Sequence, residues 1–172
     1  SYLNNRYQED AKEREQLAQE RKQKYDLSLK SIEDFTNLVY ARRTKAAMLQ
    51  SSLKRMAPKD ELIQRKRDYD LAYSEWNTKL QTTLFGIRRL SGSATYSHFE
   101  NLVETQLRRP FSLLDSCLTD AYDTRAGIRS KNQFKCDTDA LLQVTLDCSY
   151  AISDELYKFA VIDHQAPTAD KQ

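Results

Sequence analysis

The chain has 172 residues, a formal net charge of +2 and 30% charged residues. A chain of this length can bury a hydrophobic core as one domain, without disulfides or metal ions. Its composition differs from that of a disordered protein, and it lacks a run of about 20 apolar residues that could span a membrane. The small net charge gives no overall attraction to nucleic acid or to an anionic membrane.

Helix breakers are scarce, with only three glycines and three prolines. The strongest breaks are Pro58, Gly92, Pro110, Gly127 and Pro167, and the segments between them carry apolar residues at helical spacing. The pattern predicts an all-α protein, an antiparallel up-down-up-down four-helix bundle. We expect helices at about 5–57, 59–91, 94–126 and 138–165, with a polar tail at 167–172.

The first predicted helix has two parts. From Tyr25 onwards its heptad positions form an apolar stripe that only Ser28 and Arg42 interrupt. Residues 1–24 are charged on most faces and have only a few apolar side chains on one side, those of Leu3, Tyr7, Ala11 and Ala18. We therefore expect residues 25–166 to form the bundle and residues 1–24 to overhang it as an exposed helical stalk.

The third predicted helix contains Pro110, which lacks a backbone N–H and clashes with the preceding turn. We expect a kink or a short break at Arg108–Arg109. Ser93 or Thr95 is a suitable N-cap for this helix, and the fourth helix should begin at Asp137 or Thr138. An aromatic cluster on the second helix is typical of a core rather than a ligand site, and consists of Tyr69, Tyr73 and Trp76.

Residues typical of catalytic sites are sparse. The two histidines, His98 and His164, complete no metal-binding motif. Glu100 and Glu104 lie one turn apart, a spacing that an acid/base pair could use but that is also typical of a solvated helix face. The sequence has no glycine-rich phosphate loop. We therefore expect no enzymatic activity, no metal and no cofactor.

The three cysteines lack zinc-site spacing. Cys117 and Cys148 lie at equal distances from the middle of the predicted third connection, so a symmetric antiparallel hairpin would place them at the same height. This predicts a Cys117–Cys148 disulfide, with Cys136 as a free thiol in the loop. The alternative is that Cys117 and Cys148 are both small, reduced core residues.

Positive charge is concentrated at the first hairpin, because residues 41–67 contain nine bases and two acids. In this topology the third connection lies at the same end and adds further bases. We predict a basic pole that docks an acidic protein, a lipid headgroup surface or another polyanion; no motif for sequence-specific nucleic-acid binding accompanies it. Its candidate residues are Arg55, Lys59, Arg65, Lys66, Arg67, Arg129, Lys131 and Lys135.

These features predict a non-catalytic helical interaction or structural module. The stalk is compatible with an upstream membrane anchor and with a homodimer formed through it. A disulfide would fit a periplasmic or secreted setting. The alternative is a soluble cytoplasmic adaptor that binds and neutralises a protein partner.

Overall fold

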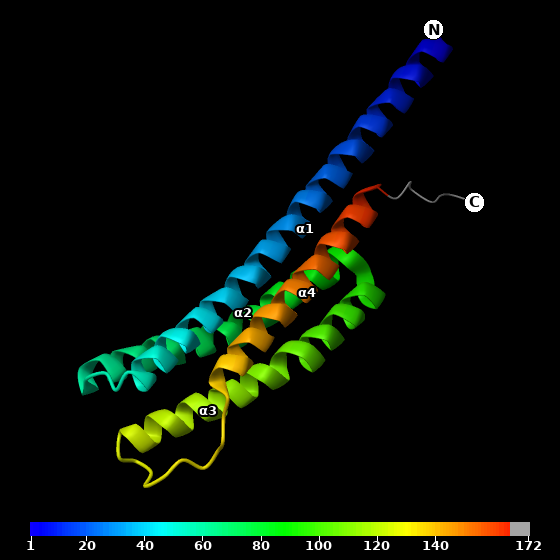
Figure 1. Cartoon of the computed structure of the whole chain (residues 1–172). Coiled ribbons are helices and arrows are strands. Elements are labelled where there is room, and N and C mark those ends of the chain that lie inside the picture. The colour runs from blue at the N-terminus through cyan, green and yellow to red at the C-terminus, as the bar shows by residue number, and fades with distance from the viewer. Residues whose placement is uncertain (166–172) are drawn as a thin grey trace.

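A computed structural model describes residues 1–165, without the side chains of 91–95 and 163–165. The chain is all-α, which confirms the predicted fold class (Figure 1). The expected cap at Ser93 or Thr95, His164 and the expected tail at 167–172 lie outside this description. The helices are α1 (Tyr2–Lys54), α2 (Lys59–Leu102), the π-helical turn η1 (Val103–Arg108), α3 (Arg109–Arg125) and α4 (Thr138–Gln165).

The core follows the apolar stripe of α1. From Ile32 to Leu49 its buried residues recur at intervals of three and four, so they share one helix face. The Phe35 ring meets Phe99 edge-on, with centroids 5.3 Å apart. Fully buried side chains from all four helices and from η1 thus form one core, which includes Phe35, Val39, Leu49, Phe99, Leu107, Phe111, Leu114 and Ile152.

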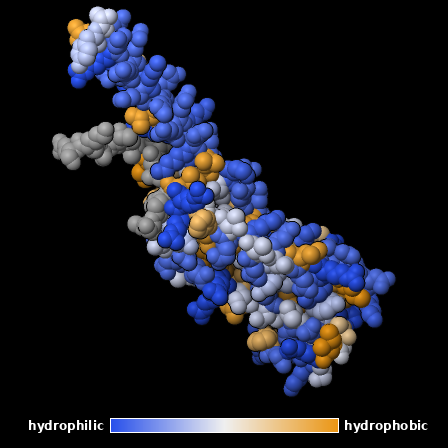
Figure 2. Space-filling view, turned by 180° about the vertical axis from the view of Figure 1, so that it is seen from behind, coloured by the Kyte–Doolittle hydropathy of each residue, from blue (hydrophilic) through white to orange (hydrophobic). Residues whose placement is uncertain are grey.

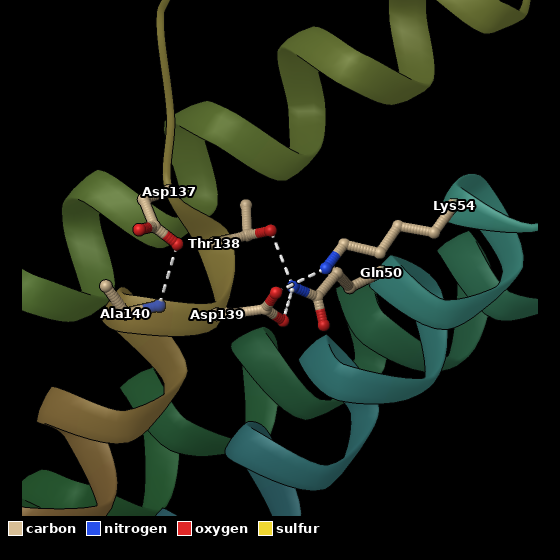
Figure 3. Close-up of polar contacts among 6 residues, drawn as sticks. All are labelled: Gln50, Lys54, Asp137, Thr138, Asp139 and Ala140. Carbon is tan, nitrogen blue, oxygen red and sulfur yellow. Dashed lines mark hydrogen bonds and ion pairs between the residues drawn. The ribbon is translucent and has the colours of Figure 1, made fainter.

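Contacts between α1 and α4 run in opposite order along the two helices. Thr36 contacts Ser153, whereas Gln50 contacts Thr138. Figure 3 shows the second of these contacts, where the end of α1 meets the start of α4. The Gln50 amide donates hydrogen bonds to Thr138 Oγ1 at 2.5 Å and to Asp139 Oδ1 at 2.8 Å.

The first turn of α4 is fixed by two carboxylates (Figure 3). Asp137 Oδ1 accepts a hydrogen bond from the Ala140 N–H at 3.0 Å and so caps the helix, which begins at Thr138, one of the two starts expected from the sequence. Asp139 Oδ2 lies 2.5 Å from Lys54 Nζ. The hydrogen bonds from Lys54 and Gln50 lower the pKa of Asp139, because they stabilise its ionised form.

The predicted boundary between the second and third helices is wrong. Helix α2 continues past Gly92 to Leu102. The chain nevertheless reverses direction near Gly92. Contacts between residues before and after it show this, since Arg88 lies over the ring of Tyr96 and Trp76 packs against Phe111. A sharp bend in a continuously helical backbone therefore takes the place of the expected loop, as the green segment of Figure 1 shows.

The irregularity near Pro110 lies one turn earlier than expected. Residues Val103–Arg108 form the π-helical turn η1, and α3 begins at Arg109 with no gap. Proline removes one helical hydrogen bond and crowds the carbonyl four residues before it. A wider turn directly before Pro110 is a conformation that accommodates both effects.

The N-terminal part of α1 projects beyond the other helices (Figure 1). Residues 1–20 are all exposed, and burial begins at Arg21 and Tyr25. Figure 2 shows that this overhang is mostly hydrophilic, with separate hydrophobic patches. At 1.5 Å per residue, the 53 residues of α1 extend about 80 Å.

Helices α1 and α3 end in the same hydrogen-bonding motif with different residues at the left-handed position. After α1, Met56 has φ 56° and the Ala57 N–H bonds to the Ser52 carbonyl. After α3, Gly127 occupies this position with φ 78°. Because side chains disfavour positive φ, Met56→Gly should stabilise the fold by about 0.5–1 kcal/mol. Chemical denaturation measures this.

The matched control reverses the substitution at the other helix end. Gly127→Ala should destabilise the fold by about 1 kcal/mol, although nothing lies within 4 Å of the added Cβ. Equal effects of the two substitutions would contradict this interpretation of the helix ends.

Candidate functional site at the basic end of the bundle

The predicted basic residues lie on or next to two connections, which are at the same end of the bundle (Figure 1). The first is the short link Arg55–Pro58 between α1 and α2, and the second is the link 126–137 between α3 and α4. The docking surface predicted from the sequence would lie here.

The second link folds back along α3 and does not bridge the helix ends directly. The buried Asp120 carboxylate accepts hydrogen bonds through Oδ2 from the Gln133 N–H at 2.8 Å and the Phe134 N–H at 3.2 Å. Arg129 Nη1 lies 3.5 Å from Asp120 Oδ1, and its Nε lies 3.6 Å from Asp123. One carboxylate on α3 thus organises most of the link.

Because the link folds back along α3, the disulfide joins a different pair of cysteines from the predicted one. Cys117 is bonded to Cys136, with Cα atoms 5.9 Å apart, and Cys148 is a free, half-buried thiol whose pKa burial raises. The predicted Cys117–Cys148 pairing is therefore wrong.

The error came from assuming a symmetric hairpin. His98 on α2 contacts Glu155 on α4, and at equal rise per residue this register places Cys136 beside Cys117. Cys148 then lies about 18 Å further along the bundle.

Several of the predicted docking residues form ion pairs with acidic residues of the same chain. Arg55 pairs with Glu61, and Lys66 Nζ lies 2.7 Å from Asp70 with only 19% of its side chain exposed. Lys66 also lies over the ring of Tyr122. Together with Arg129, these bases hold the fold together locally and contribute less to an outward-facing charge.

The run Arg65–Lys66–Arg67 does not form one patch. Successive residues on a helix point about 100° apart. Arg65 is half-buried and lies 3.8 Å from the Met48 sulfur of α1, whereas Lys66 faces α3 and Arg67 is exposed. Only Arg67 of the three presents its charge freely to solvent.

Five exposed bases at this end have no ion pair among the residues that the structure describes. They are Lys59, Arg67, Arg125, Lys131 and Lys135. Arg125, in the last turn of α3, belongs to the basic end that the sequence predicts, although it was not among the candidate docking residues. These bases, and not the whole predicted set, are available to an anionic partner.

A small hollow lies between the first turns of α2 and the last turn of α3. Its volume is about 230 Å³, and Leu62, Ile63, Tyr122 and Ala126 line it. Lys59 and Arg125, one from each helix, also border it. We define the basic tip as Lys59, Arg125 and Lys131 together with this hollow. It offers an apolar recess between positive charges.

Arg42, which interrupts the apolar stripe of α1, is 4% exposed. Its Nη2 lies 2.5 Å from Asp115 Oδ2, and Tyr69 donates a hydrogen bond to Asp115 Oδ1. The guanidinium also lies 4.3 Å from the Phe111 ring and 5.1 Å from Trp76. Burial raises the pKa of Asp115, and the attraction of Arg42 offsets this only in part.

The expected core role is confirmed for Tyr69 and Trp76, which are 3% and 5% exposed. Tyr73 instead is 43% exposed, although Arg42 lies 5.1 Å from its ring.

The remaining sequence candidates lie on exposed helix surfaces. His98 Nε2 lies 3.4 Å from Glu155 and the ring meets Phe159 edge-on. Glu104 pairs with Arg108 at 2.6 Å. Glu100 interacts with Tyr96 instead, and desolvation together with this carboxylate raises the pKa of the phenol. The two glutamates thus have separate partners. Within residues 1–162, no three His, Cys, Asp or Glu side chains are grouped to hold a metal ion.

None of the described helices is long and apolar enough to cross a membrane. Comparisons with protein-family models, with curated proteins and with solved structures find no match to this chain.

Proposed function

We propose that the protein is a non-catalytic helical interaction module that docks an anionic partner at the basic tip. The hollow between Lys59 and Arg125 carries the proposal, because an apolar recess flanked by bases suits an acidic segment with one apolar side chain. The link between α3 and α4 contributes a further exposed base, Lys131. These bases form no ion pair within the part of the chain that the structure describes, so an incoming carboxylate would not have to displace an acid.

The partner that fits best is an acidic protein segment. A carboxylate on each side of an apolar side chain could meet Lys59 and Arg125 while the apolar group enters the hollow. A lipid surface would use the positive charge but would not need a recess. The proposal therefore favours a protein over a membrane.

Binding of synthetic peptides tests the proposal. A fluorescent glutamate-rich peptide with one central leucine should bind the intact chain, and more weakly as salt rises. Replacing the leucine by serine should weaken binding about tenfold, because burial of the leucine side chain is lost.

The triple variant Lys59→Glu, Arg125→Glu and Lys131→Glu should weaken binding of the leucine peptide at least about tenfold, since three favourable charge contacts become repulsive. The matched control is Lys12→Glu, Arg14→Glu and Lys158→Glu, with the same charge change at exposed residues far from the tip. Equal binding by the two variants would refute docking at the tip. Binding to phosphatidylserine vesicles without peptide binding would refute the protein partner.

A further inference from the structure

A groove runs between α1 and α2, away from the basic tip. Two adjoining hollows of about 470 and 530 Å³ share Asp34, Thr82 and Thr83, and so form one channel. On α1 it extends from Leu27 to Ala41, which is about 21 Å of helix. On the α2 side the groove is lined in part by the small residues Thr82, Thr83 and Gly86. The two helices are close at Gly86, where an added Cβ would lie 3.8 Å from Ser31 Oγ of α1.

The residues of α1 that line this groove continue as a seam along the overhang. Five of them, Leu27, Ser31, Asp34, Leu38 and Ala41, recur at intervals of three and four, as in a helix that packs against another helix. The same spacing continued towards the N-terminus reaches Leu17 and Leu3. The side chains of Leu3, Leu17 and Leu27 are 77%, 47% and 52% exposed. In full, the seam is Leu3, Arg6, Asp10, Glu13, Leu17, Glu20, Lys24, Leu27, Ser31, Asp34, Leu38 and Ala41.

We propose that two copies of the chain pair antiparallel along α1, so that the overhang of each copy lies in the α1/α2 groove of the other. The lengths agree, because Leu3 to Leu17 and Leu27 to Ala41 each span about 21 Å. A twofold axis near residue 22 makes both contacts at once, which is the self-complementary geometry of a closed dimer.

This register covers the exposed leucines. Leu17 of each copy lies opposite Leu27 of the other, and Leu3 lies opposite Ala41. Near the axis, Glu20 lies opposite Lys24 in both directions, which gives two ion pairs of opposite charge. A single register therefore satisfies apolar and charged positions of the seam.

Charge along the contact is complementary. The overhang half of the seam, Leu3 to Glu20, contains three acids and one base, whereas the groove is bordered by three bases and two acids. The one unfavourable pairing is Asp10 opposite Asp34, where Lys30, with its Nζ 3.4 Å from Asp34, supplies compensating charge. The groove bases are Lys30, Lys79 and Arg89.

The shape of the chain also permits this arrangement. None of the described helices lies beside the overhang, which leaves room for the partner's bundle (Figure 1). The paired helices would be in contact from Leu3 to Ala41, about 57 Å. The contact does not involve the basic tip, so it is independent of the function proposed above.

Sedimentation velocity on the full chain tests the dimer. The wild type should dimerise in a concentration-dependent way, and Leu17→Glu should weaken the dimer at least about 100-fold, because the change occurs twice per dimer. The matched control is Leu113→Glu on α3, where the leucine is 49% exposed, and it should dimerise normally. A monomeric wild type up to the solubility limit would overturn the proposal.

Charge exchange tests the register. Glu20→Lys should weaken the dimer, because two lysines then face each other, and adding Lys24→Glu should restore it. Failure of the double variant to recover would overturn this register.

Spin labels separate antiparallel from parallel pairing. A single label at Asn4→Cys, in a Cys148→Ser background, should give an interlabel distance of about 54 Å in the antiparallel dimer, since 36 residues separate the labels along the helix axis. A short distance would show parallel pairing and contradict the proposal.

Discussion

Replacement of Asp115 by alanine should destabilise the protein by about 3–5 kcal/mol, a large part of the stability of an ordinary domain. The substitution leaves Arg42 buried without its carboxylate, and its Nε already has no hydrogen-bond partner. The nearby Phe111 and Trp76 rings attract the cation but cannot replace a charged acceptor. Urea denaturation of wild type and variant measures the difference.

The double variant Arg42→Met and Asp115→Leu should recover most of the lost stability. Desolvation outweighs the attraction of Arg42 in setting the pKa of Asp115, so the intact pair itself contributes little. The control is loss of the exposed Glu104–Arg108 pair, which lies outside the α1/α2 groove and should leave stability almost unchanged. If the double variant were as unstable as Asp115→Ala, lost packing and not an unpaired charge would explain the effect.

Replacement of Cys136 by alanine should cost about 3 kcal/mol under non-reducing conditions. The disulfide closes a loop of about 20 residues and so restricts the unfolded chain, while the exposed Cys136 side chain packs against little else. Guanidinium denaturation measures the loss. With reductant present, wild type and variant should have nearly equal stability, because neither then carries the bond.

Cys148→Ala is the matched control, and it should change stability by less than about 1 kcal/mol since this half-buried thiol forms no bond. Alkylation without reductant should label Cys148 alone. If Cys148→Ala lost the stability and Cys136→Ala did not, Cys117 would be bonded to Cys148.

The sequence was sufficient to predict the core of α1, because a strict three-four spacing places Phe35, Val39 and Leu49 on one face whatever the partner helix is. It also contained a signal for the buried ion pair. A base inside an apolar stripe needs a carboxylate, but many acids were available, and only the packed helices bring Asp115 to Arg42.

The path of the second link could not be predicted, because it depends on Asp120 binding two backbone N–H groups more than twelve residues away. This contact places Cys136 beside Cys117, which spacing alone could not reveal. The division of Arg65, Lys66 and Arg67 among three directions, by contrast, follows from the 100° step of the helix. The length of a charged run was therefore a poor guide to a surface.

Hydrogen–deuterium exchange of the intact chain with the leucine-containing acidic peptide tests docking at the tip most directly. Protection is expected in the first turns of α2, the last turn of α3 and the link 126–137, and it should disappear in the Lys59→Glu, Arg125→Glu, Lys131→Glu variant. Protection confined to other segments, or none at concentrations where the peptide binds, would contradict docking at the basic tip.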